Sequence, residues 1–458
     1  MRKISLFLII INLLVTIFSF VIVKLRSSES QIGDADVYFN ESLLIDKGIF
    51  HEYFLNLHNY GYPTFLSVLR IFGIESRFEV GVLQHSMLLF SVGLLSSVIS
   101  KNRTQFLYTL TLLNFSIFIP NGIAYSSNTL TESLVSTIYI LTIVLTYLLI
   151  LNLKSLNDGK IIVSQNVIYI FLIAMFSGVI MMLRPAYIWV PVIFFVIIIS
   201  LFLRQKINFI FTIFVLPIIF VVGVVIVFIP EMWISNLLGG NLSNSVFSLG
   251  MAKANTQYAY YTWTFFTNMT GCGPLGWDLS PYFEWPTTYG DFVQTSPKLS
   301  LFDKFAALSM HLVNMIDPRP GPTYNFSLTG NHWYPLTIIN AIIIFLTVAY
   351  LFFYLRNFRN TRIQNKEFFF TNVLLVLSSL FMAVRIHGEY RFGQFLFISM
   401  AIFCAFMFNN SDYKYQFKKN TKVIVFLFTI QLIVLIILKE QVLNSSDYLS
   451  YCISSFAS

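Results

Sequence analysis

The sequence has few charged residues. Only 11% of its 458 residues are Asp, Glu, Lys or Arg, whereas soluble globular domains carry about 25%. Hydrophobic residues make up 56% of the chain, and the mean hydropathy is +0.73. A protein surrounded by water needs more charge on its surface than this. The composition therefore excludes an ordinary soluble domain and indicates a chain whose solvent is largely lipid.

Cysteine is also scarce, and the residues that bind metals or nucleotides are not arranged in known motifs. Cys272, Cys404 and Cys452 lie far apart, without the paired spacing of zinc ligands. The six histidines show no pattern such as His-Glu-x-x-His. No glycine-rich loop follows a strand, as it does in nucleotide-binding folds. These absences argue against zinc, thiol or nucleotide chemistry.

Long apolar runs recur along the whole chain, each about long enough to cross a hydrocarbon core of roughly 30 Å as a helix. The first run follows Arg2 and Lys3 without a small-residue cleavage site, so we expect an uncleaved signal anchor. The sequence predicts an all-α polytopic membrane protein with about 11 transmembrane helices, near residues 4–23, 78–99, 106–119, 134–153, 167–183, 187–203, 207–229, 336–355, 368–384, 392–408 and 423–438.

The distribution of positive charge predicts the orientation of these spans. With the N-terminus in the cytoplasm, 16 of the 29 Lys and Arg residues fall in short inner connections, opposed there only by Asp158, Glu367 and Asp412. Cytoplasmic loops of membrane proteins carry such an excess of Lys and Arg. We therefore expect a multi-pass protein of a bacterial inner membrane with an extracytoplasmic C-terminus. Membrane topology explains the positive charge, and no nucleic-acid partner is expected.

Three outer segments interrupt the apolar pattern and divide the chain. Residues 1–229 are predicted to form an N-terminal transmembrane module whose first outer loop spans about residues 25–77. Residues 230–334 form one large extracytoplasmic loop, rich in Gly, Pro, Asn and Ser. Residues 335–458 form a C-terminal transmembrane module with a short outer hairpin at residues 385–391. Short helices along the membrane interface are expected near residues 36–44 and 62–72.

The first outer loop opens with two carboxylates, Asp34 and Asp36, one residue apart. One carboxylate of such a pair can deprotonate a hydroxyl while the other orients it. Alternatively, the pair can hold a divalent cation, or it can be an acidic turn in solvent. No cofactor is assigned from the sequence, and a divalent cation stays one alternative.

The order of the motifs resembles the GT-C superfamily of membrane glycosyltransferases, in particular the polyprenyl- and dolichyl-phosphate-sugar mannosyltransferase branch. Asp34 with Tyr38, and then Tyr62-Pro63, match its pattern of an acidic residue after the first span, a tyrosine four positions on and a later Tyr-Pro element. Three further elements extend the likeness from about residue 30 to about residue 400: Thr131-Glu132, Leu183-Arg184-Pro185 and Glu389-Tyr390-Arg391.

The resemblance implies a GT-C-like fold and a general base in the first outer loop. The donor is then a polyprenyl-phosphate-linked sugar, and the acceptor is an extracytoplasmic glycan, lipid or protein at the membrane lipid boundary. In the family the second acid often follows the first directly, whereas Ala35 intervenes here. The base is therefore either Asp34 or Asp36. Glu132 is implied as a further site carboxylate, and its alternative is a helix cap at the start of a span.

Outer arginines are the candidates for binding the donor phosphate, because a guanidinium can hold phosphate oxygens in a bidentate manner. Arg391, Arg184 and Arg385 lie near the outer ends of predicted spans, where flanking cations also snorkel to the interface. Tyrosines of the first outer loop and the residues of the short hairpin complete the predicted substrate site: Tyr38, Tyr62, His387, Glu389 and Tyr390.

The predicted function is therefore a membrane glycosyltransferase, with two alternatives. One is a surface-polysaccharide polymerase or ligase, which also combines many spans with a large outer loop. The other is a flippase or transporter for lipid-linked sugars. Transporters place ionisable residues within their spans, whereas here the acids gather at the outer ends of the spans. That distribution favours chemistry at one membrane face.

Overall fold

The computed structural model describes residues 2–27, 34–50, 60–118, 131–155, 163–184, 187–205, 210–237, 342–351, 366–385, 390–409 and 429. Within these ranges the regular structure is helical and contains no strand. The chain divides into two compact units. Unit 1 contains residues 1–253, 363–375 and 401–409, and unit 2 contains residues 254–362, 376–400 and 410–458.

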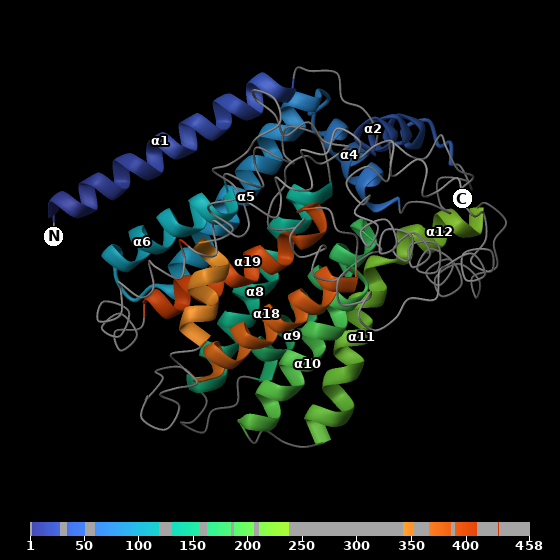
Figure 1. The fold of residues 1–458 in the computed structure, drawn as a ribbon. Coiled ribbons are helices and arrows are strands. Elements are labelled where there is room, and N and C mark those ends of the chain that lie inside the picture. The colour runs from blue at the N-terminus through green and yellow to red at the C-terminus, as the bar shows by residue number, and fades with distance from the viewer. Residues whose placement is uncertain are drawn as a thin grey trace, which may run out of the picture. The chain divides into compact units, whose positions relative to one another are not determined.

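Most of the described helices belong to unit 1, and Figure 1 shows them coloured along the chain from blue to red. In chain order they are α1 (Arg2–Ser27), α2 (Asp34–Ile45), α4 (Gly61–Ile71), α5 (Arg77–Ile99), α6 (Arg103–Leu113), the π-helical turn η1 (Asn114–Phe118), α8 (Thr131–Ser155), α9 (Val163–Leu183), α10 (Trp189–Arg204), η5 (Phe211–Val215), α11 (Leu216–Val227) and α12 (Ile229–Leu237). Helices α18 (Lys366–Arg385) and α19 (Tyr390–Phe408) each have one part in either unit.

Four described helices are long and apolar enough to cross a membrane: Ser5–Leu25, Arg77–Ile99, Thr131–Lys154 and Gln165–Leu183. Shorter apolar helices cover Trp189–Arg204, Phe211–Val227, Ile342–Leu351 and Gln394–Phe408. The protein is thus an all-α membrane protein in the part of the chain that the structure describes. The count of about 11 spans stays a prediction. Apart from Thr429, the predicted span at 423–438 lies outside the described residues, and so do several connections between helices.

Helix α8 is the core of unit 1. It packs against α5 and α9, and 72% of the residues in its apolar 18-residue stretch are buried. Its large side chains Tyr139 and Tyr147 are buried, and so are Ser133, Ser136 and Thr146. The hydroxyls of Thr137 and Thr146 donate to backbone carbonyls four residues earlier, so these polar groups are satisfied within the helix. By contrast, α1 exposes most of its apolar side chains, as a helix facing lipid does.

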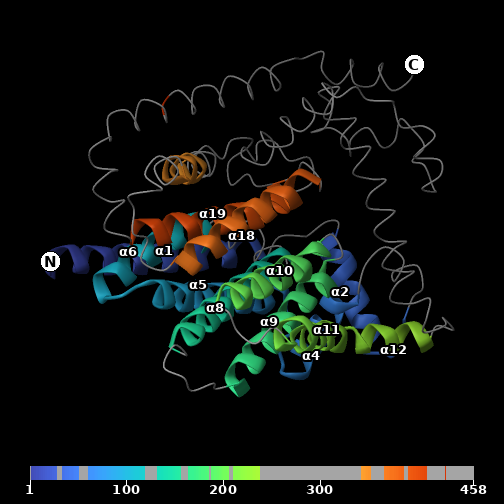
Figure 2. The ribbon, with the colours of Figure 1, turned by 90° about the horizontal axis from the view of Figure 1, so that it is seen from below.

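Helices α9 and α11 pack against each other (Figure 2), and their backbones come close together at glycines. A Cβ atom added to Gly223 would lie 2.7 Å from Ala174 Cβ and 2.9 Å from the Phe171 carbonyl oxygen. A Cβ atom added to Gly178 would lie 3.1 Å from the Val224 carbonyl oxygen. Small residues at helix interfaces allow such backbone contact within membranes.

The first outer segment contains the two short helices expected near residues 36–44 and 62–72. They are α2 and α4, which pack against each other. Pro63 lies in the first turn of α4, where its missing N–H has no intrahelical partner to lose. Helix α5 then starts with a capping box, in which Ser76 Oγ accepts from the Glu79 N–H and the Glu79 carboxylate accepts from the Ser76 N–H.

In unit 2, the described residues include the second half of α18 and the first part of α19. The hydroxyls of Ser379 and Ser399 share a hydrogen bond of 3.0 Å that joins these two segments. Arg385 ends α18, and Tyr390 and Arg391 begin α19. The segment predicted as a short hairpin, residues 385–391, thus includes the end of α18 and the start of α19. Residues 386–389, which include His387 and Glu389, lie outside the described part of the chain.

Candidate functional site

The acidic pair of the first outer loop lies in the first turn of α2. Asp34 is its first residue and Asp36 its third. A helix N-terminus favours negatively charged side chains, because the backbone N–H groups of the first turn carry partial positive charge. The Arg77 guanidinium, at the start of α5, donates through Nη2 to Asp36 Oδ1 in a part-buried ion pair. Among the described residues, Asp36 Oδ2 is not engaged.

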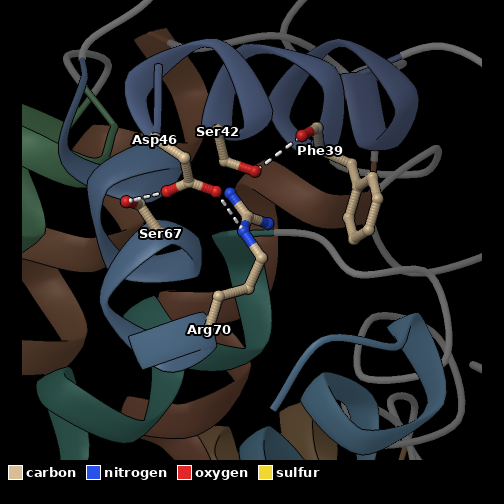
Figure 3. Close-up of polar contacts among 5 residues, drawn as sticks. All are labelled: Phe39, Ser42, Asp46, Ser67 and Arg70. Atoms are coloured by element: carbon tan, nitrogen blue, oxygen red, sulfur yellow. Dashed lines mark hydrogen bonds and ion pairs between the residues drawn. The ribbon is translucent and has the colours of Figure 1, made fainter. Parts of the chain in front are cut away.

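A second Asp–Arg pair lies at the other end of α2 (Figure 3). Arg70 Nε, in the last turn of α4, donates to Asp46 Oδ2 at 2.5 Å, and Ser67 Oγ donates to Asp46 Oδ1 at 2.5 Å. Burial raises the pKa of Asp46. The hydrogen bonds from Ser67 and Arg70 and the charge of Arg70 together lower it by more, so the pKa is below its usual value.

Phe39 connects the two Asp–Arg pairs. The Arg70 Cζ atom lies 5.8 Å and the Arg77 Cζ atom 4.8 Å from the centre of its ring, within the range of a cation–π interaction. Figure 3 shows the Arg70 guanidinium between Asp46 and Phe39. The two guanidinium groups thus hold both ends of α2 in place against α4 and α5.

Two predicted site tyrosines meet between α2 and α4. The rings of Tyr38 and Tyr62 make an edge contact with centroids 5.3 Å apart, and both are buried. Gln84 Nε2, on α5, donates to the Tyr62 hydroxyl oxygen at 2.7 Å. Burial raises the pKa of Tyr62 far above its ordinary value, and although the Gln84 hydrogen bond lowers it, the nearby Glu132 and Tyr38 raise it further. Tyr62 is therefore a neutral phenol close to Glu132.

Glu132 forms a buried ion pair in the first turn of α8. Its side chain has no exposed surface, and Glu132 Oε1 accepts from Arg184 Nη2, which follows the last turn of α9. Thr131 Oγ1 donates to Glu132 Oε2 at 3.1 Å. The structure places the Arg184 guanidinium on this carboxylate, with 12% of the side chain exposed. The predicted role of Arg184 in phosphate binding stays a prediction.

The contacts bring α2, the start of α4, the start of α8 and the end of α9 together at one end of unit 1. Met182, in the last turn of α9, lies against Gly61 at the start of α4, since a Cβ atom on Gly61 would lie 3.0 Å from Met182 Cγ. Tyr62 then links this junction to Tyr38, Gln84 and the region of Glu132. The predicted residues Asp36, Tyr38, Tyr62, Glu132 and Arg184 thus belong to one connected cluster, which we call the outer cluster.

Sequence reasoning missed several members of this region. Arg77, Arg70, Asp46 and Gln84 were not assigned to a site. Neither was Glu41, which is 6% exposed and accepts a hydrogen bond of 2.9 Å from the Tyr60 hydroxyl. Glu41 lies three residues after Tyr38 on the buried face of α2. That helical spacing was the one available signal, because a carboxylate on a buried face needs a partner.

The other predicted site residues are not tested. The side chains of Asp34, Arg385, Tyr390 and Arg391 lie outside the described part of the structure, and so do His387, Glu389 and residues 238–334 of the predicted large loop.

The described residues do not test a divalent cation at the acidic pair, because the side chain of Asp34 lies outside them. They contain no group of three His, Cys, Asp or Glu side chains that could hold a metal ion. The Arg77 guanidinium also occupies one oxygen of Asp36, and a cation at that carboxylate would lie next to this positive charge.

Comparison with known proteins gives limited information. No protein-family model matches the chain, and no curated protein matches it. Among solved structures, the apo crystal structure of the Archaeoglobus fulgidus oligosaccharyltransferase is similar, with a TM-score of 0.48 and 14% sequence identity. The match covers 97% of this chain and 55% of that one, so the chain spans about half the length of that enzyme. A similarity this low does not define a shared family.

Proposed function

We propose that this chain is a membrane glycosyltransferase that moves a sugar from a polyprenyl-phosphate-linked donor to an extracytoplasmic acceptor. The observation that supports the proposal is the outer cluster itself. Asp36, Tyr38, Tyr62 and Glu132 come from three motifs that are separated by up to about a hundred residues in the sequence. The resemblance to GT-C enzymes implies that these motifs share one site.

In the proposed reaction, the acceptor hydroxyl attacks the anomeric carbon of the donor sugar. The bond from that carbon to the phosphate oxygen breaks, and the polyprenyl phosphate leaves with the electron pair. The hydroxyl proton passes to Asp36 or Asp34. Arg77 holds Asp36 Oδ1, which leaves Oδ2 to accept the proton, as general base catalysis requires.

The proposal gives the remaining charged residues separate tasks. The leaving phosphate gains negative charge, so fixed cations next to it lower the barrier. Arg391 and Arg385 are the proposed phosphate ligands. Arg184 also remains in the site, where it holds Glu132 in place. Tyr38 and Tyr62, together with His387, Glu389 and Tyr390 of the hairpin, are proposed to contact the sugars.

The test is a transfer assay on the purified full-length protein with a panel of polyprenyl-phosphate sugars. We expect Asp36→Asn or Asp34→Asn to lower the rate by about 10²- to 10⁴-fold, the usual contribution of a general base. The matched control is Asp46→Asn. Asp46 directly follows the same helix and is also paired with an arginine, so its loss should change the rate only slightly.

Two results would overturn the proposed chemistry. Full activity in both Asp34→Asn and Asp36→Asn, each correctly inserted, would remove the base. Equal losses in Asp36→Asn and Asp46→Asn would mean that the variants act through the packing of α2. Mass analysis of the product separates the polymerase alternative, because a polymerase or ligase would transfer an oligosaccharide and not a single sugar.

A further inference from the structure

A second charged cluster lies at the end of unit 1 opposite the outer cluster. Helix α8 begins at Thr131 beside Glu132 and ends at Ser155, so Lys154 lies about 33 Å away along the helix axis. Lys154 Nζ contacts Glu367 Oε2 at 2.8 Å, in the first turn of α18. Arg204, the last residue of α10, lies with its Cζ atom 4.7 Å from the centre of the Phe370 ring. Three segments that are distant in sequence therefore meet here.

The described residues of this cluster carry excess positive charge. Lys154, Arg204 and Lys366 are cations, and Glu367 is the one acid recorded among them. Burial raises the pKa of Glu367, but the Lys154 hydrogen bond and the charges of Lys154 and Arg204 lower it by more. Glu367 therefore stays ionised near neutral pH, and it neutralises only part of the surrounding charge.

Arg204 differs from the described arginines in and around the outer cluster. Arg70, Arg77 and Arg184 each contact a carboxylate. Arg204 is exposed, and within the described residues it makes no hydrogen bond or ion pair. Its Cζ atom lies over the Phe370 ring, 4.7 Å from the ring centre, within the range of a cation–π interaction. A guanidinium fixed in this way is suited to bidentate binding of a phosphate group.

Helix dipoles do not explain the whole cluster. Cations are favoured in the last turn of a helix, where Lys154 and Arg204 lie. Lys366, however, is exposed in the first turn of α18, where the dipole disfavours a positive charge. An anion bound next to Lys366 would offset that cost.

The surroundings indicate which anion this is. Leu203, next to Arg204, and Leu151, three residues before Lys154, expose 48% and 44% of their surface. Exposed leucines beside the ends of membrane helices face acyl chains, so the cations lie at the level of the lipid headgroups. We propose that Arg204 and Lys366, with Lys154 beside them, bind the phosphate of an anionic phospholipid headgroup, with its acyl chains along Leu203 and Leu151.

The proposal is tested by lipid retention. The full-length protein is reconstituted in bilayers that contain phosphatidylglycerol and phosphatidylcholine, and the phosphatidylglycerol that stays bound is measured by native mass spectrometry. One basic residue near a membrane surface contributes enough to change lipid affinity about fivefold. We expect Arg204→Gln and Lys366→Gln each to lower retention by about that factor, and Glu367→Gln to raise it.

The matched control is Arg103→Gln. Arg103 is an exposed arginine in the first turn of α6, at the same end of unit 1, and among the described residues it has no aromatic ring beneath it. We expect this variant to retain phosphatidylglycerol like the wild type. An equal loss in Arg103→Gln, or no loss in the Arg204→Gln and Lys366→Gln double variant, would overturn the site. If Arg204→Gln does not fold, Lys366→Gln decides the question alone, because the Lys366 side chain is exposed.

Discussion

Glu132 carries a charge where a charge is costly. It has no exposed surface, and it lies in the first turn of a helix long and apolar enough to span a membrane. Its two oxygens are held by Arg184 and Thr131. Removing one partner of a buried ion pair leaves the other charge uncompensated, which is far more destabilising than losing an exposed pair.

We therefore predict that Arg184→Met lowers the free energy of unfolding by about 3–5 kcal/mol. The measurement is denaturant unfolding of the protein in detergent micelles. In the double variant Glu132→Gln, Arg184→Met no charge is left unpaired, so it should be more stable than Arg184→Met alone. If the effects of the two substitutions simply add, the pair is not coupled and the prediction is wrong.

At this scale the sequence predicted the residues but not their partners. Glu132 was identified because a carboxylate beside an apolar run needs a partner or a function. Its partner is 52 positions later, and no local pattern connects a residue at the start of one span to one after the end of the next. The sequence likewise did not indicate that Arg184 contacts a carboxylate, since an outer-end arginine looks alike whether it faces a carboxylate or a ligand.

The contact of α9 with α11 shows how glycine controls the packing of two elements. Gly223 touches the backbone of α9 and would gain a Cβ atom 2.7 Å from Ala174 Cβ. Gly93, on α5, has no atom within 4 Å of the position that a Cβ atom would take. Both are helical glycines, so a Gly→Ala substitution changes the intrinsic helix preference in the same favourable direction at each.

We predict that Gly223→Ala destabilises the protein by about 1–3 kcal/mol, because the methyl group must push α9 and α11 apart. Gly93→Ala should instead be neutral or stabilise it by up to about 1 kcal/mol. Thermal unfolding of both variants in the same detergent gives the comparison. Equal shifts in the two variants would show that packing at Gly223 does not determine the outcome.

The existence of the helices was more predictable than their lengths. The expected helices at 36–44 and 62–72 occur as α2 and α4, and the apolar runs coincide with α5, α8 and α9. The run at 106–119 begins earlier, at Arg103, because Asn102 Oδ1 accepts from the Gln105 N–H and caps the helix. It ends in the π-helical turn η1, where the Phe118 ring stacks on His85 of α5. Hydropathy along the chain does not predict a contact of this kind.

The proposed function depends on the outer cluster facing the extracytoplasmic side, where the acceptor lies. The charge distribution predicts this orientation, and the structure supplies a helix on which to test it. Helix α5 has 23 residues, which is about 35 Å at 1.5 Å per residue and enough to cross a hydrocarbon core of roughly 30 Å. Glu75 and Lys101 flank this helix, and both are exposed.

In a background where Cys272, Cys404 and Cys452 are replaced by serine, we predict that Glu75→Cys reacts with a membrane-impermeant maleimide on intact cells. Lys101→Cys should react only after permeabilisation, and the serine background should stay unlabelled. The reverse pattern would place Asp36 and Glu132 on the cytoplasmic side. The acceptor would then have no access to the base, whereas the ion pairs and the glycine contact would be unaffected, because they depend on packing and not on orientation.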